Sequence, residues 1–293
     1  MEKISKIKIF LIGCVMGLAD LVPGVSGGTI AFVAGIYDEL ITSIKCVTNN
    51  SLALVVRGKF KEAVKTIPFG FLLPLFSGIF LFIFSMAGVL SWLLEKHSSF
   101  VWSFFFGLVV ASTLIILRRL KSLTVNVMIA FAAGIVISYV ISGLVPVETP
   151  LTSLSVFLSG AIAITAMVLP GISGSFILVV LGKYEQILNA VAQRDIFVIV
   201  IFVLGAFVGL ALFSRLISWF LKTKHDTAIA ILSGFMLGSL RTIWPWKSES
   251  VSGVVANAIP DGFDMPVIFI ILLAILGFVL VWVLNRFSII DKD

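Results

Sequence analysis

The chain has 293 residues, of which 60% are apolar and only 12% are charged, and its formal net charge is +6. Soluble domains average about 45–50% apolar and about 25% charged residues. The composition therefore excludes an ordinary soluble enzyme, a disordered chain and a disulfide-rich scaffold. We expect an all-α polytopic membrane protein whose positive charge reflects basic cytoplasmic loops, with no nucleic acid as a partner.

Ten predominantly apolar runs are candidates for membrane helices. A helix needs about 20 residues to cross a hydrocarbon core of ~30 Å, and six of the runs reach or approach that length. The other four are shorter and form two pairs, each interrupted at a Pro-Gly dipeptide. We expect each pair to form a broken, re-entrant hairpin; two complete crossings per pair are the alternative. In chain order the runs are 9–22, 27–44, 69–94, 99–117, 124–145, 153–169, 174–191, 196–221, 227–243 and 266–285.

Two connections between the runs are long enough to have structure of their own. Residues 51–65 are basic with interspersed apolar side chains, so we expect the segment 48–66 to be an interfacial helix on the cytoplasmic leaflet. A solvated basic loop is the alternative. Residues 244–264 contain Pro, Gly and Trp, which favours a lid or an interfacial loop on the outer side.

The distribution of basic residues indicates the orientation. With the N-terminus in the cytoplasm, 15 of the 21 Lys and Arg residues fall in cytoplasmic segments, five fall outside and one lies within a span. Cytoplasmic segments of membrane proteins carry an excess of positive charge. We therefore expect a multi-pass protein of the cytoplasmic membrane with both termini in the cytoplasm.

An internal repeat divides the chain. Residues 23–41 match residues 170–188 at an offset of 147 and share the pattern Pro-Gly-x-Ser-Gly. We predict two repeats, 1–145 and 151–293, each made of one hairpin and three spans. Because three is odd, the second repeat is inverted relative to the first, which is a transporter architecture. Weaker matches, at offsets of 127 and then 143, pair Gly78 with Gly205, Gly107 with Gly234, and Gly134 with Gly277.

The shared pattern predicts an anion site. Proline lacks an N–H group and glycine allows a sharp turn, so the helices are expected to break at Pro23-Gly24 and Pro170-Gly171. The helix that begins after each break has N–H groups without intrahelical partners and a partial positive charge. Two such N-termini, meeting in the membrane from opposite sides, suit a phosphate or a carboxylate. The residues assigned to this site are Ser26, Gly27, Gly28, Thr29, Ser173, Gly174 and Ser175.

The same pattern has two other interpretations. Small residues let membrane helices pack closely, so tight packing is one alternative. An intramembrane serine protease is another, but its serine needs a base within hydrogen-bond reach. The only histidines, His97 and His225, lie in predicted loops at the membrane edges, and no His or Cys cluster suits zinc. We therefore expect no enzyme activity, no metal and no cofactor.

Asp20 is an acidic residue at the predicted membrane midplane. It lies roughly 17 Å along a helix from Lys8, at 1.5 Å per residue. An acid at this depth is costly and usually functional. Coupling of transport to a proton or a cation is one role. Capping of the helix that begins near Ser26, or pairing with an arginine, is the alternative.

Three arginines at span ends are candidates for contact with a lipid phosphate. Arg118 and Arg119 end a span at the predicted cytoplasmic face, and Arg241 ends one at the outer face. A guanidinium group can bind a phosphate through two hydrogen bonds. Snorkelling of the side chain to the interface is the alternative.

The segments GLADLVPGVSGGTIAFVAGIYDELI (17–41) and LPGISGSFILVVLGKYEQIL (169–188) closely resemble the bacterial polyprenyl-phosphate transporter family, formerly catalogued as domain-of-unknown-function 368. This resemblance implies a flippase of the bacterial cytoplasmic membrane that returns undecaprenyl phosphate from the outer to the inner leaflet for reuse. It also implies polyprenyl phosphate and membrane lipids as partners. A channel or secondary exchanger for a small ion is the alternative function, and a homo-oligomer is one option for assembly.

Overall fold

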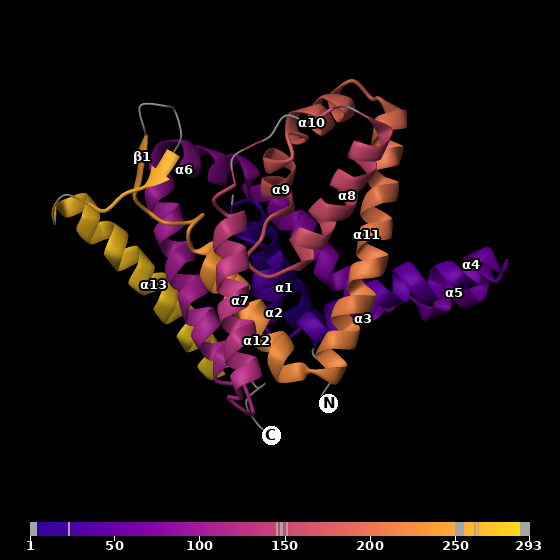
Figure 1. The fold of residues 1–293 in the computed structure, drawn as a ribbon, viewed down its shortest axis with the longest axis horizontal. Helices are drawn as coiled ribbons and strands as arrows, with labels where there is room; N and C mark the ends of the chain where they lie inside the picture. Colours follow the sequence, from indigo (N-terminus) through magenta and orange to yellow (C-terminus); the bar gives the residue numbers. More distant parts are fainter. Residues whose placement is uncertain are drawn as a thin grey trace.

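The structure is a computed structural model that describes residues 5–22, 24–144, 146, 149–150, 152–249, 255–260, 262 and 264–287, with side chains described up to 283. Apart from one short β-hairpin, the regular structure of these residues is helical (Figure 1). The first half of the chain contains α1 (Lys6–Asp20), α2 (Gly27–Val33), α3 (Tyr37–Lys45), the π-helix η1 (Cys46–Ser51), α4 (Leu52–Val56), α5 (Phe60–Thr66), α6 (Phe69–Leu117) and α7 (Val125–Ile141).

The second half repeats the order of a helix, a short broken pair and longer helices. The antiparallel strands β1 and β2 pair Lys247 with Asn257. In Figure 1, α10 and β1 lie at one end of the molecule, and the start of α1 and the end of α13 lie at the other. The elements are α8 (Ser153–Val168), α9 (Gly174–Val180), α10 (Tyr184–Ala192), α11 (Ile196–Thr223), α12 (His225–Ser239), β1 (Lys247–Glu249), β2 (Val255–Asn257) and α13 (Met265–Phe287).

The helix lengths support a multi-pass membrane protein. Within the described residues, α6, α11 and α13 are each long and apolar enough to cross a membrane, and α9 with α10 forms a further candidate, bent by 107°. Large apolar side chains are exposed on these helices; Phe84 is 81% exposed. Such exposed apolar surface is expected where a protein faces lipid instead of water.

Two elements differ from the sequence prediction in their extent. The runs 69–94 and 99–117 are confirmed as two helical segments: the range of α6 covers both, and they meet at a kink at His97, whose backbone is non-helical (φ −142°, ψ 38°). The run 227–243 begins earlier, as α12, and its helix ends at Ser239, because the chain then forms turns. The segment 244–264 contains the two strands of the hairpin, which were not predicted.

The basic segment between the first hairpin and α6 is helical over most of its length. It consists of η1, α4 and α5, and the last two project sideways from the bundle (Figure 1). Val56 and Phe60 are 79% and 63% exposed, and the exposed Lys59 forms an ion pair with Glu62 at 3.1 Å. Exposed apolar and charged side chains on short helices agree with the predicted helical form of this segment.

Glycines bring four pairs of helices into close contact. In each pair, a Cβ atom on the glycine would meet a backbone carbonyl of the facing helix, so only glycine permits the observed approach. Gly78 of α6 faces α1 at Phe10, and Gly205 of α11 faces α8 at Phe157. Gly107 of α6 faces Ala274 of α13, and Gly234 of α12 faces Phe131 of α7.

These contacts follow the weaker sequence matches. Gly78 and Gly205, which match at an offset of 127, join a long helix to the helix that precedes each broken pair. Gly107 packs on the helix of Gly277, whereas its match Gly234 packs on the helix of Gly134. The matched glycines Gly134 and Gly277 are thus exchanged between the halves: each contacts the other half of the chain.

Candidate functional site

The two Pro-Gly dipeptides lie in sharp turns between helices. Gly24 has φ +86° and Gly171 has φ +89°, a left-handed conformation that favours glycine over every other residue. The turn at Gly171 follows Pro170 and separates α8 from α9; the turn at Gly24 separates α1 from α2. Pro23 lies outside the described residues. Both helical breaks therefore occur where the sequence places the dipeptides.

The N-terminus of α2 is already hydrogen-bonded. The Gly27 N–H donates to Asp20 Oδ1 at 2.7 Å, and the Gly28 N–H donates to Ser26 Oγ at 3.1 Å. The Thr29 N–H donates to the Ser26 carbonyl at 2.9 Å. These are groups that the sequence assigned to an anion. In this conformation their partners are protein oxygens, and a carboxylate occupies the position expected for a phosphate oxygen.

The turn regions of the two hairpins contact each other directly. Ser26 Oγ donates to the Met167 carbonyl at 3.1 Å, and Tyr37 Oη donates to the Val168 carbonyl at 3.2 Å. Thr29 Oγ1 accepts from the Gly171 N–H at 2.9 Å. The last carbonyls of a helix lack intrahelical donors, so side chains of the first hairpin satisfy the end of α8. We call this set of three contacts the hairpin junction.

The hairpin junction is buried, and it is tightly packed. Ser26 is 1% exposed and Thr29 is fully buried. A Cβ on Gly28 would lie 2.9 Å from the Val168 carbonyl oxygen, and a Cβ on Gly27 would lie 2.7 Å from Asp20. Tight packing, one of the alternatives from the sequence, is therefore observed at the first motif. In this conformation, the side chains of Ser26 and Thr29 are therefore closed to the surroundings.

The N-terminus of α9 differs from that of α2. Ser173 makes no side-chain cap, and its hydroxyl instead lies 2.7 Å from that of Ser175, in an exposed pair. Gly174 between them is buried. At the sequence offset of 147, the counterpart of Asp20 is Met167, which has no carboxylate to accept from the helix. The second motif therefore presents hydroxyl groups to the surroundings, whereas the first motif is closed.

Asp20 makes the contact expected of a helix cap. Its side chain is partly buried at the end of α1 and bonds the first N–H group of α2. Among the described residues, its carboxylate forms no ion pair with an arginine. Of the roles that the sequence left open, capping is thus observed as a contact.

The three candidate arginines do not gather at the hairpin junction. The Arg118 guanidinium lies 4.5 Å from the centre of the Trp282 ring, and Arg119 follows it directly at the end of α6. Arg241 lies 4.5 Å from the Tyr139 ring and donates to the Tyr139 carbonyl at 3.1 Å. All three are at the ends of helices. The Arg241 side chain turns toward α7, although Ser239 and Thr242 on either side of it lie against the turns at Gly171 and Gly24.

Sequence reasoning missed a buried lysine at the bend between α9 and α10. Lys183 is 1% exposed, and its Nζ donates to the Thr149 and Pro150 carbonyls at 3.0 and 2.8 Å and to Gln186 Oε1 at 2.9 Å. These neutral acceptors replace the water around the ammonium group. Its position next to Gly182 in the second motif was a signal, but its two carbonyl acceptors lie more than 30 residues earlier in the chain.

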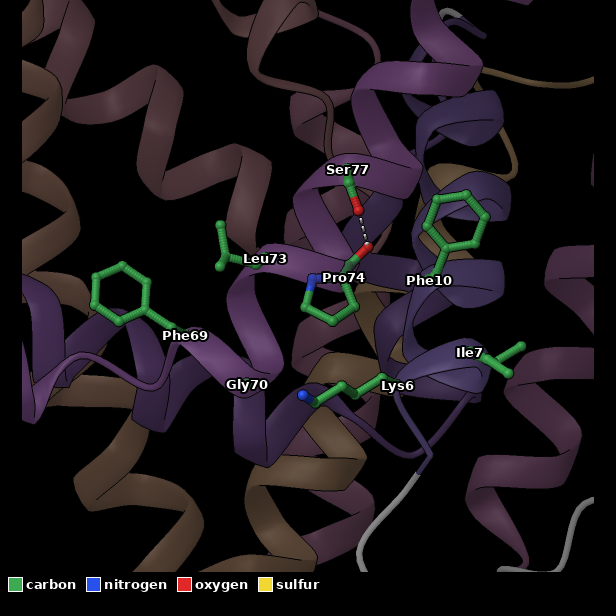
Figure 2. A pocket seen from close by; sticks show the side chains of 8 residues that line it. All are labelled: Lys6, Ile7, Phe10, Phe69, Gly70, Leu73, Pro74 and Ser77. Carbon is green, nitrogen blue, oxygen red and sulfur yellow. Dashed lines mark hydrogen bonds between the residues drawn. The ribbon is translucent and has the colours of Figure 1, made fainter.

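A surface groove of about 500 Å³ lies between α1 and the start of α6 (Figure 2). Phe10 of α1 and Phe69 and Leu73 of α6 line it, and Lys6 lies at its edge. Ser77 Oγ donates to the Pro74 carbonyl at 2.9 Å, as the dashed line in Figure 2 shows. The lining is almost entirely apolar and includes none of the residues that the sequence assigned to the anion site.

Comparison with known proteins identifies the relatives of the chain. Residues 16–258 match the model of a family described as VCA0040-like, undecaprenyl phosphate translocase-like. The chain is 44% identical, over 247 residues, to a Vibrio cholerae serotype O1 protein named polyprenyl-phosphate transporter; the match covers 84% of this chain and 80% of the relative.

A second relative has the same name. This protein, from Staphylococcus aureus, is 31% identical over 251 residues, and the match covers 80% of this chain and 84% of the relative. No solved structure matches the chain. The matched region contains both Pro-Gly motifs and all three candidate arginines.

Proposed function

Because the chain belongs to the undecaprenyl phosphate translocase-like family, we propose that it carries undecaprenyl phosphate from the outer to the inner leaflet of the bacterial cytoplasmic membrane. Both relatives are named polyprenyl-phosphate transporter. These names describe a transporter rather than an enzyme, in agreement with the expectation from the sequence. The carrier lipid would then be available again on the cytoplasmic side.

The observation that carries the mechanism is the hairpin junction. Three hydrogen bonds join residues 131 to 142 positions apart, and no continuous secondary structure holds them together. Such contacts can form and separate as the hairpins move. In the proposed cycle, the phosphate passes between the hairpins while the prenyl tail stays in lipid, and the junction closes behind it.

The proposed alternating access relies on two inverted repeats, 1–145 and 151–293. The exchanged packing of the matched glycines supports this arrangement, because a two-fold relation between halves requires corresponding helices to make corresponding contacts. Each hairpin would enter the membrane from its own side. With both termini in the cytoplasm, the first hairpin would open inward and the second outward.

In the proposed headgroup site, the two motifs bind the phosphate one after the other. Ser173, Gly174 and Ser175 are the first to meet a phosphate, because the two hydroxyls are exposed. Ser26 and Thr29 become donors when the junction separates, together with the N–H groups of Gly27 and Gly28. Arg118, Arg119 and Arg241 guide the headgroup at the two faces of the membrane.

Asp20 is the proposed coupling residue. Its carboxylate accepts from the Gly27 N–H, and a phosphate oxygen would accept from the same group. Protonation of Asp20, or binding of a cation to it, weakens its hold on that N–H and frees the position for substrate. The headgroup and the coupling ion would thereby act on the same end of α2.

Transport by the purified protein in proteoliposomes tests the proposal. Labelled undecaprenyl phosphate should cross in the presence of wild-type protein, and the double variant S173A/S175A should slow it by about tenfold, the effect of roughly one charge-assisted hydrogen bond. D20N should remove the dependence on an imposed proton or sodium gradient. S77A, whose hydroxyl bonds only its own helix, is the control and should behave as wild type.

Three outcomes would contradict parts of the proposal. Ion flux without lipid movement would replace the flippase by a channel or an exchanger. Wild-type rates in S173A/S175A would remove these hydroxyls from the headgroup site. A normal gradient dependence in D20N would leave Asp20 with its capping contact alone.

A further inference from the structure

Arg241 and Lys247 lie close together after the end of α12, and within the described residues neither is paired with an acid. Lys247 Nζ donates to the Arg241 carbonyl at 3.2 Å and to Asn257 Oδ1 at 2.6 Å. Asn257 Nδ2 donates to the same Arg241 carbonyl at 3.0 Å. In the part of the chain that the structure describes, the ion pairs involve other residues. Among the described residues, Arg241 and Lys247 therefore have no acidic counter-ion.

Aromatic rings surround the two cations. Lys247 Nζ lies 5.6 Å from the centre of the Trp102 ring, and the Arg241 guanidinium lies over Tyr139. The indole Nε1 atoms of Trp102 and Trp246 are buried, and neither has a hydrogen-bond acceptor within the described structure. This region thus has an excess of donors over acceptors, which an anionic group would balance.

An apolar groove of about 300 Å³ begins beside this cluster. It runs between α6 and α13, with Val110 on one side and Ile271 and Ile275 on the other, and Trp244 and Trp246 lie at its end. No polar atom contributes to its exposed lining. Trp244 is held in place, since its Nε1 donates to the Ala258 carbonyl at 2.8 Å and its ring packs edge-on against Phe106.

We propose that this place is the docking site for polyprenyl phosphate before translocation, with the phosphate on Arg241 and Lys247 and the first isoprene units in the groove between α6 and α13. The inference rests on the proposed function and extends it to residues outside the hairpin junction. A phosphate monoester carries nearly two negative charges and three acceptor oxygens, which match two cations that have no acidic partner among the described residues. The diester phosphate of a bulk phospholipid carries one charge.

The groove between α1 and α6 offers a contrast. It is larger, about 500 Å³, and almost entirely apolar, and one cation, Lys6, contributes to its lining (Figure 2). No aromatic ring is recorded over the Lys6 ammonium in the described residues. Acyl chains of any lipid suit such a groove. The combination of two cations and a closed aromatic end favours the site at Arg241 and Lys247 for a phosphate lipid.

Photocrosslinking tests the docking site. The probe is a polyprenyl phosphate with a diazirine on its second isoprene unit, added to the full-length protein in proteoliposomes. In wild type, the label should appear in α6 and α13, and excess undecaprenyl phosphate should compete with it. The double variant R241Q/K247Q should lose labelling at least tenfold. K96Q, which removes one exposed cation already paired with Glu95, should label as wild type.

A second pair of variants probes the groove without changing charge. I275W fills the groove and should reduce both labelling and transport at least fivefold. L276W alters the adjacent exposed position, which does not line the groove, and should leave both unchanged; the two side chains are 52% and 56% exposed. Because both positions face outward on α13, neither substitution needs the core to repack.

The outcomes separate the two proposals. Wild-type transport with normal labelling in R241Q/K247Q and in I275W would overturn the docking site and leave the proposed function intact. Absence of lipid transport by wild type would overturn the proposed function, whatever the labelling shows. Competition by phosphatidic acid but not by undecaprenyl phosphate would identify a phospholipid site and would also overturn the docking proposal.

Discussion

At the scale of single residues, the charge of Lys247 should depend on whether a phosphate is bound nearby. Burial, together with the nearby positive charge of Arg241, lowers the pKa of its ammonium group to about 8. A bound phosphate opposes both effects because it favours the charged form of the lysine. The affinity for a phosphate lipid therefore depends on the protonation of Lys247.

This dependence has a definite sign. Below pH 8 the free protein holds Lys247 charged, and above pH 8 the charge is lost, so binding of undecaprenyl phosphate should weaken by roughly tenfold between pH 7 and pH 9.5. The phosphate is already a dianion at the start of this range. Binding measured by microscale thermophoresis in detergent checks the prediction. K247R does not titrate here and should give a flat profile; the same decline in K247R would assign it to another group.

At the scale of elements, the paired glycines determine how closely the helices approach. A Cβ on Gly234 would collide with the Phe131 carbonyl and lie 3.0 Å from the Cα of Gly134. G234A should therefore force α7 and α12 apart and cost about 1–3 kcal/mol of stability. G88A, on the lipid-facing part of α6 with nothing within 4 Å of the added atom, is the matched control.

Thermal unfolding in detergent measures the difference between the two variants. G234A should unfold at a lower temperature than wild type, and G88A should unfold at the same temperature or slightly higher, because alanine favours a helix over glycine. G107A, at the position that matches Gly234, should lose a similar amount by pushing against Ala274. If G234A unfolded at the wild-type temperature, α7 and α12 could move apart without loss of stability, and this prediction would be wrong.

The elements also show what the sequence could predict. The apolar runs gave the helices, and the Pro-Gly dipeptides gave the turns, because both follow from local composition. The gap 95–98 between two apolar runs predicted a break, and the two helical parts of α6 do meet at a kink there, at His97. The strands β1 and β2 are three residues each and leave no periodicity to detect.

Long-range contacts were beyond prediction for a physical reason. The helix start at Ser26 was correctly placed, and capping by Asp20 was one of the roles left open. The Met167 carbonyl that accepts from Ser26 lies 141 positions away and was not predicted. Lys183 was taken for an external basic residue because its acceptors lie in a different connection. Local pattern reveals which groups need a partner, and only the fold reveals which partner they have.

At the scale of the whole molecule, the proposed orientation is open to a direct test. Single cysteines replace Lys121, after α6, and Arg194, before α11, in a C46A background; Cys14 is buried and can remain. A membrane-impermeant maleimide applied to intact cells should label R194C, whereas K121C should react only after permeabilisation. The opposite result would reverse the orientation, and labelling of both in intact cells would contradict the odd number of crossings between them.

The exchanged glycine contacts also affect how the chain reaches its final state during synthesis. The face of α6 around Gly107 packs on α13, which is synthesised much later, and the face of α7 around Gly134 packs on α12. Contacts between distant parts of a chain form late. When the first half has been inserted, two of its helix interfaces therefore still lack their partner helices. These partners are synthesised about 90 to 170 residues later. Quality control of an unfinished chain would have these two bare glycine faces to recognise, and a truncation that removes α13 would leave one of them exposed permanently.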